Sequence, residues 1–322
     1  MLVNKSSRPN REEGAPAKRY LLQRRSAAES AKSGGLGSLL RCYEELARDN
    51  CISPEGACQY VSGLKGPQIR GETRLPPKTR GVEWGLRLGL GGGISGAAAL
   101  LAYRLGALTP SGAGAATALG VALFAGGGWS WLALVGVFFA TASIMTRWEP
   151  RGTAGPHGSL DVAGRRWDQV AANGGIAGVA AVLHGLSGSP LFFEAAAGAI
   201  AAATADTWAT EAGRWSPTPP RLITTGAPVL HGRSGGVTPL GTAASAGGAI
   251  LIAGVATALA GRPLHSPMLI AVLAGGFSGA LLDSVLGATI EGRFPWVENS
   301  MINLLATAWG AGVALAGALV WR

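Results

Sequence analysis

Long apolar stretches dominate this chain from Leu86 onward, and short polar loops separate them. The stretches contain about 16–24 apolar or small residues, the length that a helix needs to cross the hydrocarbon core of a membrane. The second and fifth are short and rich in Ala and Gly, so either could be a buried half-span. The sequence thus predicts an all-α, polytopic integral membrane bundle of about 6–8 transmembrane helices. The eight candidates are 86–108, 112–127, 129–146, 174–192, 193–209, 241–260, 267–290 and 301–321.

The composition supports a membrane protein and divides the chain into two parts. Hydrophobic residues make up 48% and charged residues 14% of the chain, whereas soluble proteins contain about 25% charged residues. Residues 1–83 hold 15 Lys and Arg against 9 Asp and Glu, and no lysine occurs after Lys78. We therefore expect a basic tail at 1–83 ahead of a membrane-embedded domain at 84–322, and no nucleic-acid-binding patch.

The tail itself allows two interpretations. Its first 35 residues are rich in Arg, Lys, Ser and Ala, as organelle transit peptides are, although Glu12, Glu13 and Glu29 are not typical of such peptides. The segment from Leu36 to Arg48 could instead form a short amphipathic helix that lies on a membrane.

Three polar segments interrupt the apolar part, at 147–173, 210–240 and 291–300. With eight spans, an even number of crossings separates each segment from the next, so all three are expected on one side. Their many arginines indicate the cytosol or its topological equivalent. A count of eight spans also places the basic tail on the opposite side from these segments, which conflicts with its positive charge. The conflict would disappear if one of the predicted spans among 86–146 did not cross the membrane.

Two aspartates lie where lipid normally excludes charge. Asp206 and Asp283 each sit at or near the end of an apolar run. An ionised side chain at such depth normally faces the bundle interior or a wet cavity. Glu211 can reach the same helix end as Asp206, and Ser284 follows Asp283. Asp206, Glu211 and Asp283 are therefore the candidate catalytic residues.

These residues form a plausible Mg²⁺ site, with Asp206 and Asp283 as its ligands, because Mg²⁺ takes one or two carboxylates and completes its shell with water and phosphate oxygens. The alternatives are a helix-end residue, an interhelical hydrogen bond, or proton or cation transport.

The loop RLITTGAPVLHGRSGGVTPLGTAASAG, at 221–247, runs directly into a predicted helix. Exposed glycine amides, hydroxyls, an arginine and a helix N-terminus together favour an anion such as phosphate. The loop matches neither the P-loop nor the dinucleotide-binding fingerprint. The candidate nucleotide or phosphate ligands are Thr224, Thr225, Arg233, Gly235, Gly236 and Thr238.

Two pairs of amide side chains lie at the starts of apolar spans. Gln169 and Asn173 share a helix face if their segment is helical, and Asn299 and Asn303 have the same spacing. We place them, with Ser284, in a substrate pocket. Helix capping and interhelical hydrogen bonding are the alternative roles.

Six ordered motifs in the apolar part resemble one membrane family. They are FFATASIMT, RRWDQVAANGG, ADTWATEAG, RLITTGAPV followed by SGGVTPLGT, DSVLGAT, and ENSMIN. The chain is similar over about residues 85–322 to the family known as domain of unknown function 92. That family includes transmembrane protein 19 relatives and the phytyl-phosphate kinases of tocopherol biosynthesis.

The resemblance implies phosphoryl transfer from a nucleoside triphosphate, CTP foremost, to a prenyl or phytyl monophosphate, in a chloroplast membrane. The nucleotide phosphates would lie on the Gly235-Gly236 turn and Arg233, and Asp206, Asp283 or Glu211 would hold Mg²⁺. Asp206 and Ala209 resemble the Asp-x-x-Ala pattern of polyprenol and phytol kinases. Asp283 departs from that pattern, because Leu286 occupies the position of the alanine.

Two rival classes of protein remain as interpretations of this sequence. A transporter or lipid scramblase would use the intramembrane aspartates for ion coupling. A non-enzymatic membrane scaffold is the third class, but it gives no reason for carboxylates inside the bundle.

Overall fold

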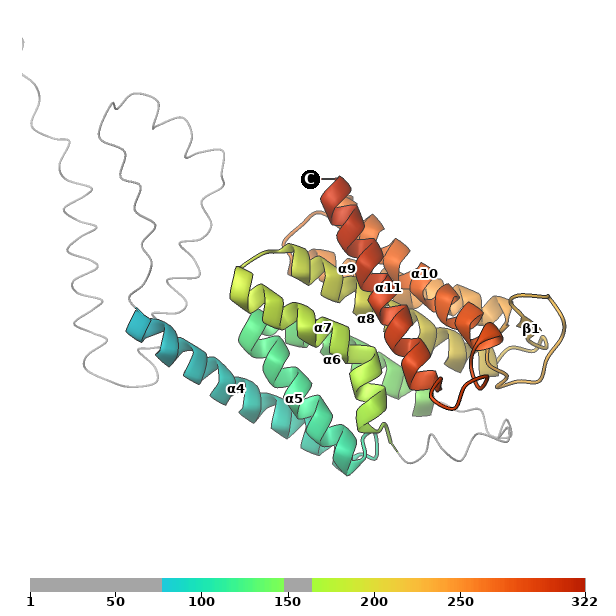
Figure 1. Cartoon of the computed structure of the whole chain (residues 1–322), viewed down its shortest axis with the longest axis horizontal. Coiled ribbons are helices and arrows are strands. Elements are labelled where there is room, and N and C mark those ends of the chain that lie inside the picture. Colours follow the sequence, from blue (N-terminus) through green and yellow to red (C-terminus); the bar gives the residue numbers. More distant parts are fainter. Residues whose placement is uncertain (1–76, 148–163, 322) are drawn as a thin grey trace, which may run out of the picture. The chain divides into compact units, whose positions relative to one another are not determined.

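The computed structural model describes residues 77–147 and 164–321, with only the backbone of 77–83 (Figure 1). The interpretations of the tail as a transit peptide or as an amphipathic helix lie outside the described residues.

Eight helices form the described part of the chain, and the predicted all-α membrane bundle is confirmed (Figure 1). They run alternately between the two ends of the bundle. In chain order they are α4 (Pro77–Arg104), α5 (Pro110–Gly127), α6 (Trp129–Arg147), α7 (Trp167–Ser187), α8 (Leu191–Arg214), α9 (Pro239–Leu259), α10 (Pro267–Thr289) and α11 (Asn299–Val320).

Six of these helices are long and apolar enough to cross a membrane, and α5 and α8 are not among them. These two correspond to the second and fifth candidate spans of the sequence. Every residue of α8 from Phe193 to Ala205 is buried. This helix therefore forms the centre of the bundle and is largely shielded from lipid by the other helices.

Small residues bring the helices around α8 into backbone contact. A Cβ at Gly198 would lie 2.3 Å from the carbonyl oxygen of Gly310, and a Cβ at Gly275 would lie 2.5 Å from the same oxygen. Because lipid provides no hydrophobic force between helices, close van der Waals packing of this kind is a main reason that membrane helices associate. The many Gly and Ala residues of the sequence thus form the interfaces between α8, α10 and α11.

Several helix boundaries differ from those predicted from hydropathy, and two of these differences concern the polar end of the bundle. Helix α7 begins at Trp167 instead of 174, and α8 continues to Arg214 instead of ending at 209. The Gln169 side chain accepts a hydrogen bond at 2.9 Å from the Arg166 backbone N–H, which helps to start α7 seven residues early. Both extensions are polar because they line a cavity and do not face lipid.

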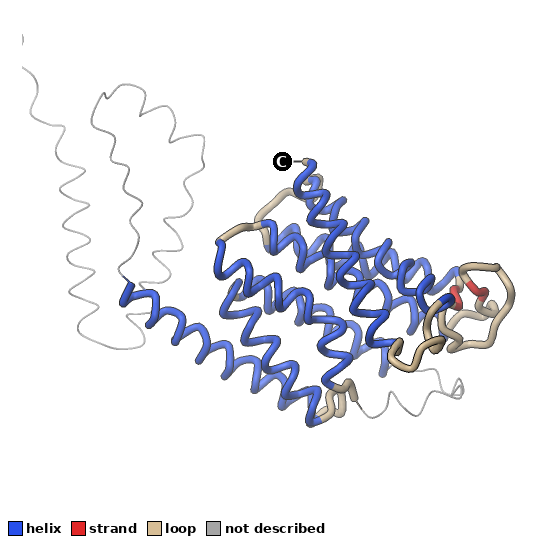
Figure 2. Tube along the Cα trace, viewed as in Figure 1, coloured by secondary structure: helices blue, strands red, loops and turns tan. Residues whose placement is uncertain are grey.

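The three polar segments predicted to share one side do lie at one end of the bundle, where their described residues line a common cavity. At the same end, β1 (Arg221–Leu222) and β2 (Gly236–Val237) pair antiparallel and form the base of a hairpin loop (Figure 2). Proline at the first turn and the Thr238 side chain, which accepts a hydrogen bond from Gly241 N–H at 3.0 Å, begin α9 directly after β2.

Candidate functional site

A cavity of about 830 Å³ occupies this polar end of the bundle. Helices α6, α8 and α10 end at it, and helices α7, α9 and α11 begin there. The structure thus brings together segments that are far apart in the sequence. The predicted site residues that line the cavity are Gln169, Asn173, Asp206, Glu211, Arg233, Gly235, Gly236, Thr238, Asp283, Ser284, Asn299 and Asn303.

The two intramembrane aspartates face each other across α8 and α10. Their side chains interact with each other, and the carboxylate of Glu291 interacts electrostatically with both. The Asp283 Oδ2 atom is buried and has no hydrogen-bond partner among the described residues. Glu291, directly after α10, was not predicted, because it lies in a polar loop and nothing in its local sequence distinguishes it.

This pair of carboxylates fits the preference of Mg²⁺ for one or two acidic ligands. Within residues 77–147 and 164–321, no three side chains of Asp, Glu, His or Cys converge as metal ligands. Asp206 and Asp283 would therefore need neutral oxygens or ligands from a substrate to complete a coordination shell.

Glu211 lines the same cavity but has its own partners. Its side chain, 7% exposed, accepts a hydrogen bond from the Thr146 hydroxyl at 2.8 Å and forms an ion pair with Arg214 at 3.2 Å. A carboxylate engaged in this way orients the guanidinium group of Arg214 beside the cavity. The geometry therefore favours a positioning role for Glu211 over a role as a third ligand beside the aspartates.

Arginines from separate segments surround the cavity, and the sequence identified most of them only as topology signals. The Arg165 guanidinium donates to the Ser143 hydroxyl at 3.0 Å and lies 5.5 Å from the centre of the Phe139 ring. Arg147 donates to the carbonyl of Leu105. With Arg214 and Arg233, these side chains provide charge that can bind phosphate groups.

The predicted phosphate loop is anchored on α10. The Ser234 hydroxyl donates to the Glu291 carboxylate, and Gly235 has a φ of 75°. A Cβ at Gly235 would lie 2.5 Å from the Cβ of Ala288, so this glycine permits close packing of the loop against α10. Arg233 and Ser234, with His231, are side chains of the loop that line the cavity.

Of the other predicted phosphate ligands, Thr238 is engaged in a helix cap, and Thr224 and Thr225 lie outside the cavity lining. The hydroxyl of Thr238 is engaged in the N-cap of α9. Thr224 and Thr225 do not line the cavity; both are exposed in the hairpin turn, where the Thr225 hydroxyl accepts a hydrogen bond from Ala227 N–H at 3.3 Å.

Replacing Gly235 with alanine is expected to loosen the hairpin loop from α10. The positive φ alone costs an alanine about 1–2 kcal/mol, and the contact with Ala288 adds to that cost. We expect faster tryptic cleavage after Arg233 in folded, detergent-solubilised protein. Gly226→Ala is the matched control, since Gly226 has a φ of 71° and open space around its Cβ position. Equal cleavage rates in the two variants would show that packing against α10 contributes nothing.

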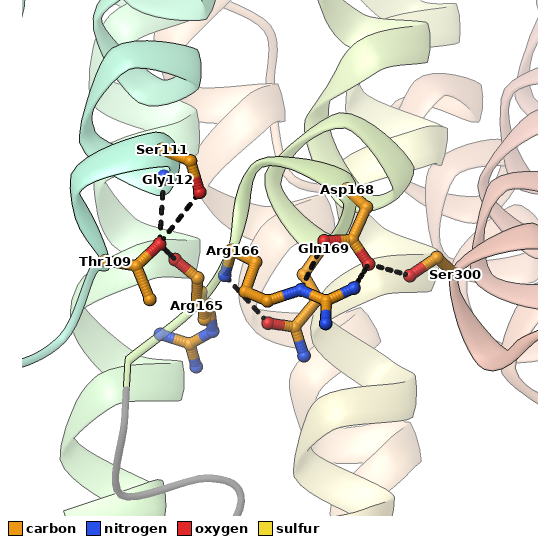
Figure 3. A network of polar contacts seen from close by, with 8 residues as sticks. All are labelled: Thr109, Ser111, Gly112, Arg165, Arg166, Asp168, Gln169 and Ser300. Atoms are coloured by element: carbon orange, nitrogen blue, oxygen red, sulfur yellow. Dashed lines mark hydrogen bonds and ion pairs between the residues drawn. The ribbon is translucent and has the colours of Figure 1, made fainter.

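A polar network joins the first turns of α7 and α11 beside the cavity (Figure 3). The Arg166 guanidinium donates to both oxygens of Asp168, at 2.9 and 3.0 Å, and Ser300 donates to Asp168 at 2.8 Å. This network fixes the two helices that carry the predicted amides. Gln169 has a capping role through its oxygen, whereas the Oδ1 atom of Asn303 is buried without a partner in the described part of the chain.

The fold and the site define a polytopic membrane protein with a large polar cavity at one end of its helical bundle. The chain matches the family Integral membrane protein DUF92 over residues 93–311. It belongs to that family, as the six motifs predicted.

Curated relatives come from a plant, a cyanobacterium and an archaeon. The chain is 33% identical to Protein PGR of Arabidopsis thaliana over 235 residues, covering 65% of this chain and 81% of the relative. An uncharacterized membrane protein of Synechocystis sp. is 30% identical over 214 residues, with the same two shares covered. One of Methanocaldococcus jannaschii is 42% identical over 113 residues, 34% of this chain and 45% of the relative. No solved structure matches the chain.

Proposed function

We propose that this protein is a membrane phosphotransferase that moves a phosphoryl group from a nucleoside triphosphate, CTP foremost, to a prenyl or phytyl monophosphate. The observation that carries the proposal is the cavity at the polar end, where a carboxylate pair and several arginines lie together. Its volume of about 830 Å³ falls within the range of small-molecule sites, about 300–1,000 Å³.

The charges around the cavity suit a reaction between two phosphate groups. Arg147, Arg165, Arg214 and Arg233 line it and can neutralise phosphate oxygens. Phosphoryl transfer depends mainly on positioning and on stabilising charge. An acceptor that is already a phosphate needs no strong general base, so the reaction requires little beyond what these side chains offer.

Mg²⁺ fits this site as a cofactor, with Asp206 and Asp283 as its protein ligands. When bound, it would neutralise developing charge on the transferred phosphoryl group. The buried, unpartnered Oδ2 of Asp283 supports this assignment, because an acceptor oxygen in that position is costly unless something satisfies it.

Exposed apolar side chains on α10 support binding of an apolar chain next to the cavity. Leu281 on α10 lines the cavity and is 36% exposed, and Val285, one turn further along the same helix, is 37% exposed. A prenyl tail could therefore lie along α10 toward lipid while its phosphate enters the polar cavity. We propose a chloroplast membrane and tocopherol metabolism as the setting, in keeping with the similarity to a plant protein.

The direct test uses purified protein in detergent micelles with γ-labelled CTP, Mg²⁺ and phytyl or geranylgeranyl phosphate. We expect label to appear in the prenyl diphosphate and to depend on both Mg²⁺ and the prenyl phosphate. ATP, GTP and UTP are tested in parallel, because the donor base is part of the proposal.

A transporter or lipid scramblase is the competing class, because paired aspartates inside a bundle also suit ion coupling. Absence of labelled product with all four nucleotides, together with proton-coupled or lipid flux in proteoliposomes, would overturn the kinase proposal in favour of that class.

A further inference from the structure

Three buried oxygens at the cavity have no hydrogen-bond partner within the described ranges. They are Ser245 Oγ on α9, Asp283 Oδ2 on α10 and Asn303 Oδ1 on α11. A buried polar atom without a hydrogen-bond partner destabilises the folded protein. A group of three lining one cavity therefore points to a ligand that satisfies them together.

The packing of α8, α10 and α11 places two of these oxygens beside the aspartate pair. A Cβ at Gly279 would lie 2.6 Å from the Cβ of Ala202 and 2.9 Å from the carbonyl oxygen of Ala306, so the three helices meet at this level. One helical turn nearer the cavity, the same faces carry the two aspartates and Asn303. The amide of Asn303 thus enters the layer in which the carboxylates face each other.

Helix α9 reaches the same layer through a second set of close contacts. A Cβ at Gly276 would lie 2.6 Å from the Cβ of Ala201 and 3.1 Å from the Cβ of Ala249. One turn nearer the cavity from Ala249, α9 carries Ser245, which is only 3% exposed. Its hydroxyl therefore lies on the face of α9 that is turned toward α8 and α10.

We infer that Ser245 and Asn303 complete a divalent-cation site with Asp206 and Asp283, one oxygen-bearing side chain coming from each of α8, α9, α10 and α11. Hard cations such as Mg²⁺ bind carboxylate, amide and hydroxyl oxygens together. A proton shared between the aspartates would leave the serine and asparagine oxygens unsatisfied. The purpose of the site in phosphoryl transfer rests on the proposed function, whereas its ability to bind a cation does not.

The test measures Mn²⁺ binding by electron paramagnetic resonance, with purified protein in detergent and no nucleotide or prenyl phosphate present. We expect saturable binding of about one Mn²⁺ per chain that Mg²⁺ displaces. Asn303→Leu should weaken Mn²⁺ binding by about tenfold or more, and Ser245→Ala should also weaken it. Asn303→Asp retains an oxygen at the same place and should bind at least as tightly as the unmodified protein.

Thr289→Val is the matched control on α10. The Thr289 hydroxyl donates to the carbonyl of Val285 at 2.7 Å and does not line the cavity, so its loss should leave Mn²⁺ affinity unchanged. Size-exclusion profiles and melting curves check that every variant is folded.

Failure of the folded, unmodified protein to bind Mn²⁺ would overturn the inference. Unchanged affinity in both Asn303→Leu and Ser245→Ala would overturn it as well, because the aspartates alone would then hold the ion. Mn²⁺ binding that is sensitive to both substitutions, in a protein without kinase activity, would support the cation site and refute the proposed function.

Discussion

Asp283→Asn is expected to reduce nucleotide-dependent phosphorylation of the prenyl phosphate by about a thousandfold, because a carboxylate that helps hold the metal contributes several kcal/mol of charge stabilisation. The amide keeps the size of the side chain and removes its charge. The protein should still insert and fold, since α10 keeps its packing against α8 and α11 and loses a buried charge that faces Asp206.

The measurement compares initial rates at saturating and at limiting Mg²⁺, with melting temperature as the check on folding. Asp206→Asn should have an effect of similar size, because both carboxylates belong to the same pair. Asp168→Asn is the contrasting variant: this carboxylate binds Arg166 and Ser300 beside the cavity without lining it, so its loss should leave the Mg²⁺ dependence unchanged. Full activity of Asp206→Asn and Asp283→Asn at limiting Mg²⁺ would contradict the assignment.

Gly310→Val is expected to disrupt the central seam of the bundle, with the largest stability loss among the substitutions considered. A Cβ at this position would lie 2.5 Å from the carbonyl oxygen of Gly198 and 2.9 Å from the Cβ of Ala202. Backbone atoms cannot move aside as a flexible side chain can. Overpacking typically costs about 1–3 kcal/mol and more in severe cases, and here α8 and α11 must separate to admit the new atoms.

Gly312→Val provides the control on the same helix, because nothing lies within 4 Å of its Cβ position. Both variants would be compared by thermal unfolding in detergent, followed by circular dichroism and aggregation. We expect a clear fall in the melting temperature for Gly310→Val and little change for Gly312→Val. Equal stability of the two variants would mean that the Gly198–Gly310 contact is not the determinant of this packing.

The helices and the general position of the candidate site could be predicted from the sequence alone. A helix satisfies its backbone hydrogen bonds internally, so an apolar run long enough to cross a bilayer is stable in lipid as a helix. The spans could therefore be predicted from local composition. The weakness of 112–127 and 193–209 as spans was visible in the same way. Asp206 and Asp283 stood out because charge inside an apolar run needs a polar environment.

The hydrogen-bond partners of the polar side chains could not be predicted from the sequence, because they depend on how the helices pack. Glu211 is paired with Thr146 and Arg214, and Gly235 fits against Ala288, although local sequence had grouped both with ligand-binding residues. Nothing in the local sequence identified Ser245 as a candidate ligand, because it is a lone serine in an apolar helix. These roles depend on the distances and rotations between helices, which are set by contacts between small residues far apart in the chain, and no local period or composition encodes them.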